Sequence, residues 1–162
     1  MFFPKEDFPI FSAQPELNYL DSAATTLKPQ VVIDTMSDFY AQQGGTVHRG
    51  IYSLAESATI RYEHARTTVA RFIGAQSHEI IFTSGATASI NFVAYAWASK
   101  HLKKGDEIII SELEHHANIL PWLRLEQELG VTVRYIPYVD GRLDYDAGEG
   151  MVSSRTKLDR KS

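Results

Sequence analysis

A small-residue turn that follows a short apolar run is the first place where this sequence offers chemistry. Residues 80–82 have the pattern of a strand, residues 83–85 break it, and helical spacing of apolar residues follows. The first turn of a helix leaves backbone N–H groups without partners, and its dipole favours an anion. Gly85 and Ala86 leave room for a phosphate group, and Thr87 offers a hydroxyl. On the local pattern alone, a helix cap by Ser84 or Thr87 is the favoured explanation.

Two adjacent histidines, His115 and His116, are the second candidate for chemistry. They follow residues 107–111 (EIIIS), which have the pattern of a buried strand, and open α/β sheets bind ligands beyond the carboxyl ends of their strands. On a helix, adjacent side chains point about 100° apart, so they serve one metal ion poorly, and no metal site is expected. A single imidazole that stacks on a flat ligand or transfers a proton suits this position better. A capping or solvated histidine is the open alternative.

His48 and Arg49 form a third group, on a loop flanked by glycine at residues 46–53. Loops between helices often display functional side chains, although two solvated loop residues are the simpler explanation. The loop joins two expected helices, which begin at about Pro29 and Leu54; Gly74 would end the second.

The expected elements give the chain its organisation. From residue 79, strands at 80–82, 107–111 and 131–138 alternate with helices, one of them at about 115–129. Such a β-α-β-α-β order predicts an α/β fold with a parallel sheet and flanking helices. Three segments are expected: an amino-terminal arm at 1–18, a helical segment at 19–78 that opens with a short strand near 18–21, and a partial α/β domain at 79–162.

Composition excludes several classes of function. The 162 residues carry a net charge of −4, with dispersed Lys and Arg, so neither nucleic acid nor a membrane is an expected partner. The sequence has no cysteine, and therefore no disulfide framework or cysteine-based zinc site. Because no secretory signal or membrane span is apparent, a cytoplasmic location is expected.

Five stretches, taken together and in this order, resemble the amino-terminal part of the class V aminotransferase family, which has fold type I of the pyridoxal phosphate (PLP) enzymes. Within the family they look most like the cysteine desulfurases and selenocysteine lyases. The stretches are residues 19–29 (YLDSAATTLKP), 47–50 (VHRG), 82–91 (FTSGATASIN), 105–111 (GDEIIIS) and 114–122 (EHHANILPW).

The resemblance implies a cofactor site for pyridoxal 5'-phosphate. By position in the family motifs, Gly85, Ala86 and Thr87 would hold the cofactor phosphate. His115 would stack on the pyridine ring and act as the catalytic group that assists proton transfer, with Asn118 close by.

The same motifs imply a substrate site. Ala23, Ala24, His48 and Arg49 would border the substrate space, near a dimer interface. The implied reaction removes sulfur from L-cysteine for iron–sulfur cluster assembly, and the implied partners are a second copy of the chain and a sulfur-acceptor protein.

The sequence also departs from the family. Ala88 and Ser89 stand where the family often has an acidic residue and glycine. The family's Schiff-base lysine, in a Ser-His-Lys context, and its persulfide-forming cysteine are both absent. We therefore expect a truncated chain with exposed strand edges and apolar helix faces. Two alternatives stay open: another class V reaction, and a catalytically inactive fragment that binds phosphate or a partner.

Overall fold

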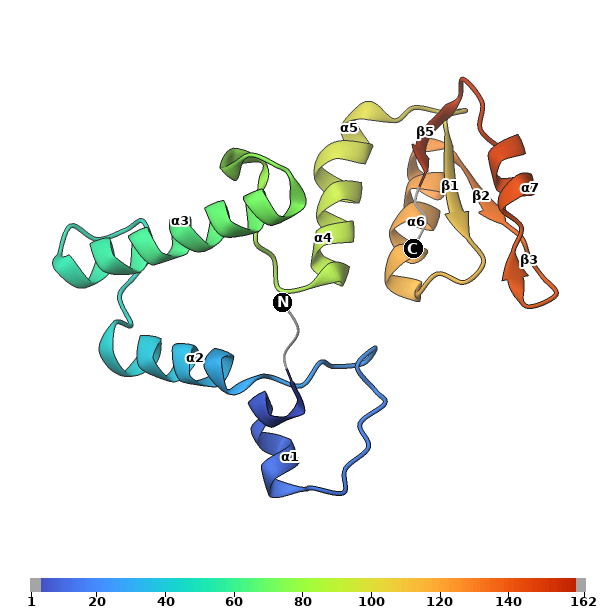
Figure 1. The fold of residues 1–162 in the computed structure, drawn as a ribbon. Coiled ribbons are helices and arrows are strands. Elements are labelled where there is room, and N and C mark those ends of the chain that lie inside the picture. The colour runs from blue at the N-terminus through green and yellow to red at the C-terminus, as the bar shows by residue number, and fades with distance from the viewer. Residues whose placement is uncertain (1–3, 160–162) are drawn as a thin grey trace. The chain divides into compact units, whose positions relative to one another are not determined.

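The computed structural model describes residues 4–159, and the chain divides into two compact units, residues 1–81 and 82–162 (Figure 1). The first unit is helical. Its elements are the 3-10 turn η1 (Lys5–Asp7), the helices α1 (Pro9–Ala13), α2 (Gln30–Gln42) and α3 (Ser53–Ile73), and the 3-10 turn η2 (Ser77–Glu79).

The two long helices of the first unit, α2 and α3, confirm the two helices that the apolar spacing predicted. Gly74 ends α3 in the left-handed conformation, with φ of 72°, as predicted. The strand expected near 18–21 is wrong, because these described residues join no strand and are followed by a turn at residues 22–24. There the amide of Ala24 donates to the Asp21 carbonyl (3.1 Å), as does the Tyr19 hydroxyl (3.1 Å).

The second unit is the α/β unit. One continuous helix runs through α4 (Ala86–Phe92), the π-helical segment η3 (Val93–Ala98) and α5 (Ser99–His101). The remaining elements, in chain order, are β1 (Glu107–Ser111), η4 (His116–Asn118), α6 (Leu120–Leu129), β2 (Thr132–Ile136), β3 (Tyr138–Val139), β4 (Arg142–Leu143), α7 (Tyr145–Gly150) and β5 (Thr156–Asp159).

A three-stranded parallel sheet, in the order β2-β1-β5, confirms the α/β class (Figure 1). Its central strand β1 is buried along its whole length. Ile108 and Ile110 pack with Trp122 and Leu125 of α6, and with alanines of η3, so both helices cover the same face of the sheet. Burial on both sides explains why β1 reads as a continuous apolar run.

The third strand of this sheet is β5, whereas the strand expected at 80–82 is not part of the sheet. Residues 80–82 are described, and Ile80 has an extended backbone, yet they join no strand, and Ile81 is 62% exposed. The place beside β1 belongs to β5 instead. An apolar run fixes an extended backbone, whereas a strand also needs a neighbour for its hydrogen bonds, and local sequence does not identify that neighbour.

Two further boundaries differ from the prediction. The expected strand at 131–138 is divided at Pro137, which has no amide hydrogen, into β2 and the hairpin strand β3. Asp140 and Gly141 make the predicted turn, with φ of 50° and 82°. The expected helix at 115–129 begins later, because residues 116–118 form a 3-10 turn before α6.

A buried carboxylate joins β5 to the sheet. The side chain of Glu107, 5% exposed, pairs with Arg155 (2.7 Å) and lies 3.6 Å from Arg134. It also accepts a hydrogen bond from the Ser153 hydroxyl (3.1 Å). The hydrogen bonds from Arg155 are the main reason why the pKa of Glu107 is lowered from its usual value.

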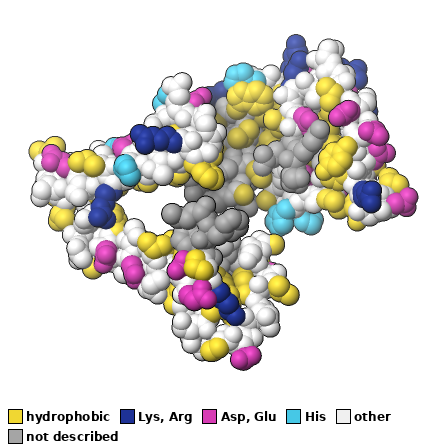
Figure 2. All heavy atoms as spheres, viewed as in Figure 1, with side chains coloured by type: hydrophobic (Ala, Val, Ile, Leu, Met, Phe, Trp, Pro, Cys, Tyr) yellow, Lys and Arg dark blue, Asp and Glu magenta, His cyan; other side chains and the backbone are white. Residues whose placement is uncertain are grey.

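Large apolar side chains remain exposed in both units (Figure 2). Leu20, Ile51 and Phe72 are each at least 90% exposed in the first unit, and Tyr95 is 72% exposed in the second. The expected exposure of apolar helix surface is therefore present on both units.

Candidate functional site

The turn before α4 presents backbone amides to solvent. Gly85 precedes the helix with φ of 154°, a conformation that L side chains rarely adopt. The first hydrogen bond of the helical ladder runs from the amide of Ser89 to the Gly85 carbonyl (3.0 Å), so the ladder does not use the amides of residues 86–88. Residues 81–87 are all exposed. The turn therefore has the donors that bind an anion.

Side chains organise this turn without capping the helix. The Thr83 hydroxyl lies 2.7 Å from the Ser89 hydroxyl and donates to the Gly85 carbonyl (3.1 Å), which ties the two ends of the turn together. Among the described residues, no side chain caps α4. The simpler explanation of the motif, a cap by Ser84 or Thr87, is therefore wrong.

A shallow hollow brings the turn and the histidine segment together. It has a volume of about 310 Å³ and is lined by Thr87, Asn91, His116, Ala117, Leu120, Pro121 and Arg124. The helices α4 and η4 lie against each other at this place. The guanidinium of Arg124 gives the hollow a positive charge, although Glu128 lies 3.7 Å away. Two motifs that are almost thirty positions apart in the sequence thus share one surface.

His115 caps the 3-10 turn η4. Its Nδ1 accepts a hydrogen bond from the amide of Ala117 (3.1 Å), and the side chain is exposed. Because Nδ1 is an acceptor here, a neutral ring carries its proton on Nε2, which points the donor away from the turn. The capping alternative is thus observed, and it leaves Nε2 for a ligand. His116, rather than His115, lines the hollow.

Asn118 is buried, at 4% exposure, and both ends of its amide have partners. Its Nδ2 donates to Oε2 of Glu114 (2.8 Å), and its Oδ1 accepts from the indole N–H of Trp122 (3.1 Å). Oε1 of Glu114 accepts from the buried hydroxyl of Ser111 (3.0 Å). Sequence reasoning overlooked the other three residues, although Glu114 and Trp122 each stand four positions from Asn118, a spacing that brings side chains together on a helical segment.

The predicted substrate residues belong to the first unit. His48 is held on α3 by its amide, which donates to the Thr59 hydroxyl (3.0 Å), and by Nε2, which lies 3.0 Å from Oε1 of Glu63. Gly50 permits this close approach, since a Cβ there would lie 2.5 Å from the Cβ of Ala55. Arg49 is exposed, as are the two alanines at 23 and 24. That these four residues border the substrate remains a prediction.

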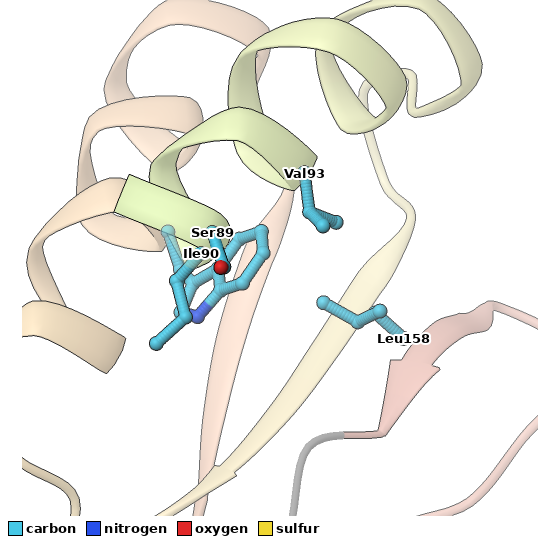
Figure 3. A pocket seen from close by; sticks show the side chains of 5 residues that line it. Ser89, Ile90, Val93 and Leu158 are labelled. Carbon is cyan, nitrogen blue, oxygen red and sulfur yellow. The ribbon is translucent and has the colours of Figure 1, made fainter. Parts of the chain in front are cut away.

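A second hollow in the α/β unit is apolar. It has a volume of about 180 Å³ and is lined by Ser89, Ile90, Val93, Trp122 and Leu158. Figure 3 shows Val93 extending from the helix toward Leu158 of β5. An amino-acid substrate carries charged groups that such a lining does not pair, so we assign no substrate to this hollow.

Two features are absent from the described residues, 4–159. No helix in that range combines the length and apolar character needed to cross a membrane. Within the same range, no three His, Cys, Asp or Glu side chains are grouped so as to hold a metal ion.

Comparisons with known proteins now give the family. A family model described as aminotransferase class-V matches residues 18–159. A protein of Mycolicibacterium paratuberculosis named "Probable cysteine desulfurase" is 49% identical over 160 residues, which cover 95% of this chain and 23% of the relative.

Solved structures agree. The apo cysteine desulfurase of Thermococcus onnurineus superposes with a TM-score of 0.87 at 37% identity, over 97% of this chain and 38% of that one. The Escherichia coli cysteine desulfurase CsdA gives a TM-score of 0.78 at 40% identity, over 98% of this chain and 41% of that one.

This chain therefore spans between about a quarter and two fifths of the length of the proteins it matches. The comparisons confirm the resemblance drawn from the five sequence stretches: the chain belongs to the class V aminotransferase family.

Proposed function

We propose that this chain carries the phosphate- and ring-binding part of a PLP-dependent cysteine desulfurase. The observation that carries the proposal is the exposed, uncapped amino end of α4 at Gly85, which shares a surface with the segment that follows β1. The names of the relatives and of the solved structures support the choice of reaction. The activity of those proteins is assigned to this chain only by analogy, because the chain spans a minor part of their length.

The residues present fit the cofactor. A Cβ built at Gly85 meets no heavy atom of the described residues within 4 Å, so the space in front of the amides is open. Ala86 adds little bulk beside it, and the exposed residue Thr87 lines the same hollow as Arg124. Backbone amides, a hydroxyl and a guanidinium are the groups that bind phosphate in proteins.

Each remaining residue has a role in the proposal. PLP, when bound, supplies an electron sink for breaking bonds at the amino-acid substrate. Within the chain, His115 would lie against the cofactor ring and exchange a proton at Nε2, since Nδ1 is engaged by the backbone. Asn118 keeps one amide hydrogen beyond the one donated to Glu114, and it would direct that hydrogen toward the cofactor.

The substrate side of the proposal rests on the family motifs. Ala23, Ala24, His48 and Arg49 would border L-cysteine. A second copy of the chain and a sulfur-acceptor protein are the proposed partners, and a cytoplasmic location is part of the same proposal.

One observation favours a second candidate function. The 162 residues include no cysteine, so this chain cannot itself carry sulfur as a persulfide. The second candidate is accordingly a chain that binds the cofactor phosphate without transferring sulfur.

The experiment is a titration of the purified chain with PLP, followed by absorbance and then by borohydride reduction and intact-mass analysis. Saturable binding at one site supports the proposal, and release of sulfide from added L-cysteine would favour the desulfurase over the second candidate. If PLP binds only as scattered lysine adducts without saturation, the proposal is wrong.

A further inference from the structure

A polar chain, buried except for the partly buried Glu114, connects the end of β1 to α6. It runs from the hydroxyl of Ser111 through the carboxylate of Glu114 and the amide of Asn118 to the indole of Trp122, with contacts of 3.0, 2.8 and 3.1 Å. Ser111, Asn118 and Trp122 are each at most 4% exposed. Polar groups in such a place need their partners, so the geometry of this chain is tightly constrained.

From this geometry we infer that Glu114 is a positioning residue, which holds the side-chain amide of Asn118 in a single orientation. The value of that orientation for binding PLP rests on the function proposed above. The orientation itself follows from the chemistry of the neighbours.

The two neighbours of Asn118 make opposite demands on its amide. The indole N–H of Trp122 only donates, so it needs the amide oxygen, and an ionised Glu114 only accepts, so it needs the amide nitrogen. A rotation of the amide by 180° would place donor against donor at Trp122 and acceptor against acceptor at Glu114. Both contacts would be lost together, and Trp122 is 2% exposed, so water has little access to replace the lost partner of its indole N–H.

Glu114 is itself held from the strand side. Its amide donates to the Ser111 carbonyl (3.4 Å) while its carboxylate accepts from the Ser111 hydroxyl. On the other side, the backbone N–H of Asn118 donates to the His115 carbonyl (2.7 Å), and this hydrogen bond closes the turn that presents His115. Glu114 therefore connects the rigid central strand to the turn that would face the cofactor.

Three variants separate the length of the side chain from its charge. In Glu114→Gln the amide oxygen can accept from Asn118 while its NH₂ donates to Ser111, because a serine hydroxyl rotates and also accepts. In Glu114→Asp the charge remains, but the side chain is one methylene shorter and no longer reaches Asn118. Glu114→Ala removes the contact entirely. We expect the Gln variant to behave like the wild type and the other two to lose the orientation.

The readout is the indole N–H of Trp122, observed by ¹H–¹⁵N NMR in the full 162-residue chain. The chain has two tryptophans, and a Trp97→Phe variant assigns the signals. We expect the Trp122 N–H to exchange slowly with solvent in the wild type and in Glu114→Gln. Exchange should be about tenfold faster or more in the Asp and Ala variants, with a similar loss of PLP affinity.

Unchanged exchange in both the Asp and Ala variants would overturn the inference, and so would unchanged PLP affinity in variants whose exchange is accelerated. If the Ala variant does not fold, the Asp variant decides, because it keeps the charge and most of the volume. If the wild type fails to bind PLP, the proposed function is wrong, and the exchange rates alone then decide whether Glu114 orients Asn118.

Discussion

Replacing Gly85 by alanine tests whether the turn before α4 binds the cofactor phosphate. The change adds one methyl group at a residue with φ of 154°, in a space where no described heavy atom lies within 4 Å of the new Cβ. Steric contact therefore adds nothing to the free-energy cost of the substitution. The cost comes from the backbone conformation that the alanine must adopt. A non-glycine residue in this region costs about 1–3 kcal/mol, which the turn relieves by moving its amides.

The magnitude of the binding loss follows from those amides. A hydrogen bond to a charged group contributes about 1.5–3 kcal/mol, so a turn that loses one amide to the phosphate should bind PLP roughly 10- to 150-fold more weakly. The matched control is Gly105→Ala in the same unit. Gly105 also has a positive φ, of 89°, with no described heavy atom within 4 Å of a built Cβ, and it lies outside the phosphate motif.

Two assays separate stability from binding. Urea denaturation should show a similar loss of unfolding free energy, of about 1–3 kcal/mol, in both variants. Titration with PLP should show weaker binding only in Gly85→Ala. If Gly85→Ala binds PLP as tightly as Gly105→Ala does, the reasoning about the turn is refuted.

Two further predictions concern the stability of the fold. Ile110→Ala, at a fully buried position beside Trp122, should lower the unfolding free energy by about 2–5 kcal/mol. The control Ile51→Ala, at a position 99% exposed, should change the unfolding free energy by less than about 0.5 kcal/mol. Urea denaturation of both variants measures these changes. Because the pKa of Glu107 is lowered in the folded state, its ionised form stabilises the fold above the ordinary glutamate pKa, and this contribution is lost as pH falls through the lowered value. Thermal unfolding between neutral and acidic pH should therefore show a smaller acid-induced loss of stability in Glu107→Gln than in the wild type, and an equal loss would contradict a lowered pKa of Glu107.

The sequence predicted the elements whose signals are local. The continuous apolar run at 107–111 identified the buried central strand, and Gly74 marked the end of α3, where it adopts a left-handed conformation. Such features depend on residues within one or two turns of each other. They need no knowledge of distant partners.

Pairing between distant segments was not accessible in the same way. Residues 80–82 have strand character but no strand neighbour among the described residues, whereas β5, with its polar residues, pairs with β1 through a register shift between Glu107 and Ile108. A contact beside this strand is the ion pair between the buried carboxylate of Glu107 and the exposed guanidinium of Arg155, which are 48 positions apart. Sequence patterns carry no signal for a contact of that separation.

The candidate site shows the same difference between features with a local sequence signal and contacts without one. The motifs at 82–91 and 114–122 were identified from residue types and family resemblance, and the hollow lined by Thr87 and His116 brings these two motifs together. The network around Asn118 was overlooked because Glu114 and Trp122 look like an ordinary polar residue and an ordinary core residue until their polar atoms are seen to meet.

The most direct test of the central claim compares the affinity of the chain for PLP with its affinity for pyridoxal, which lacks the phosphate group. If the amino end of α4 binds the phosphate, PLP should bind at least about tenfold more tightly than pyridoxal, and ³¹P NMR should show one shifted signal at saturation. Equal affinities, together with an unshifted phosphorus signal, would contradict the claim that this turn is a cofactor site.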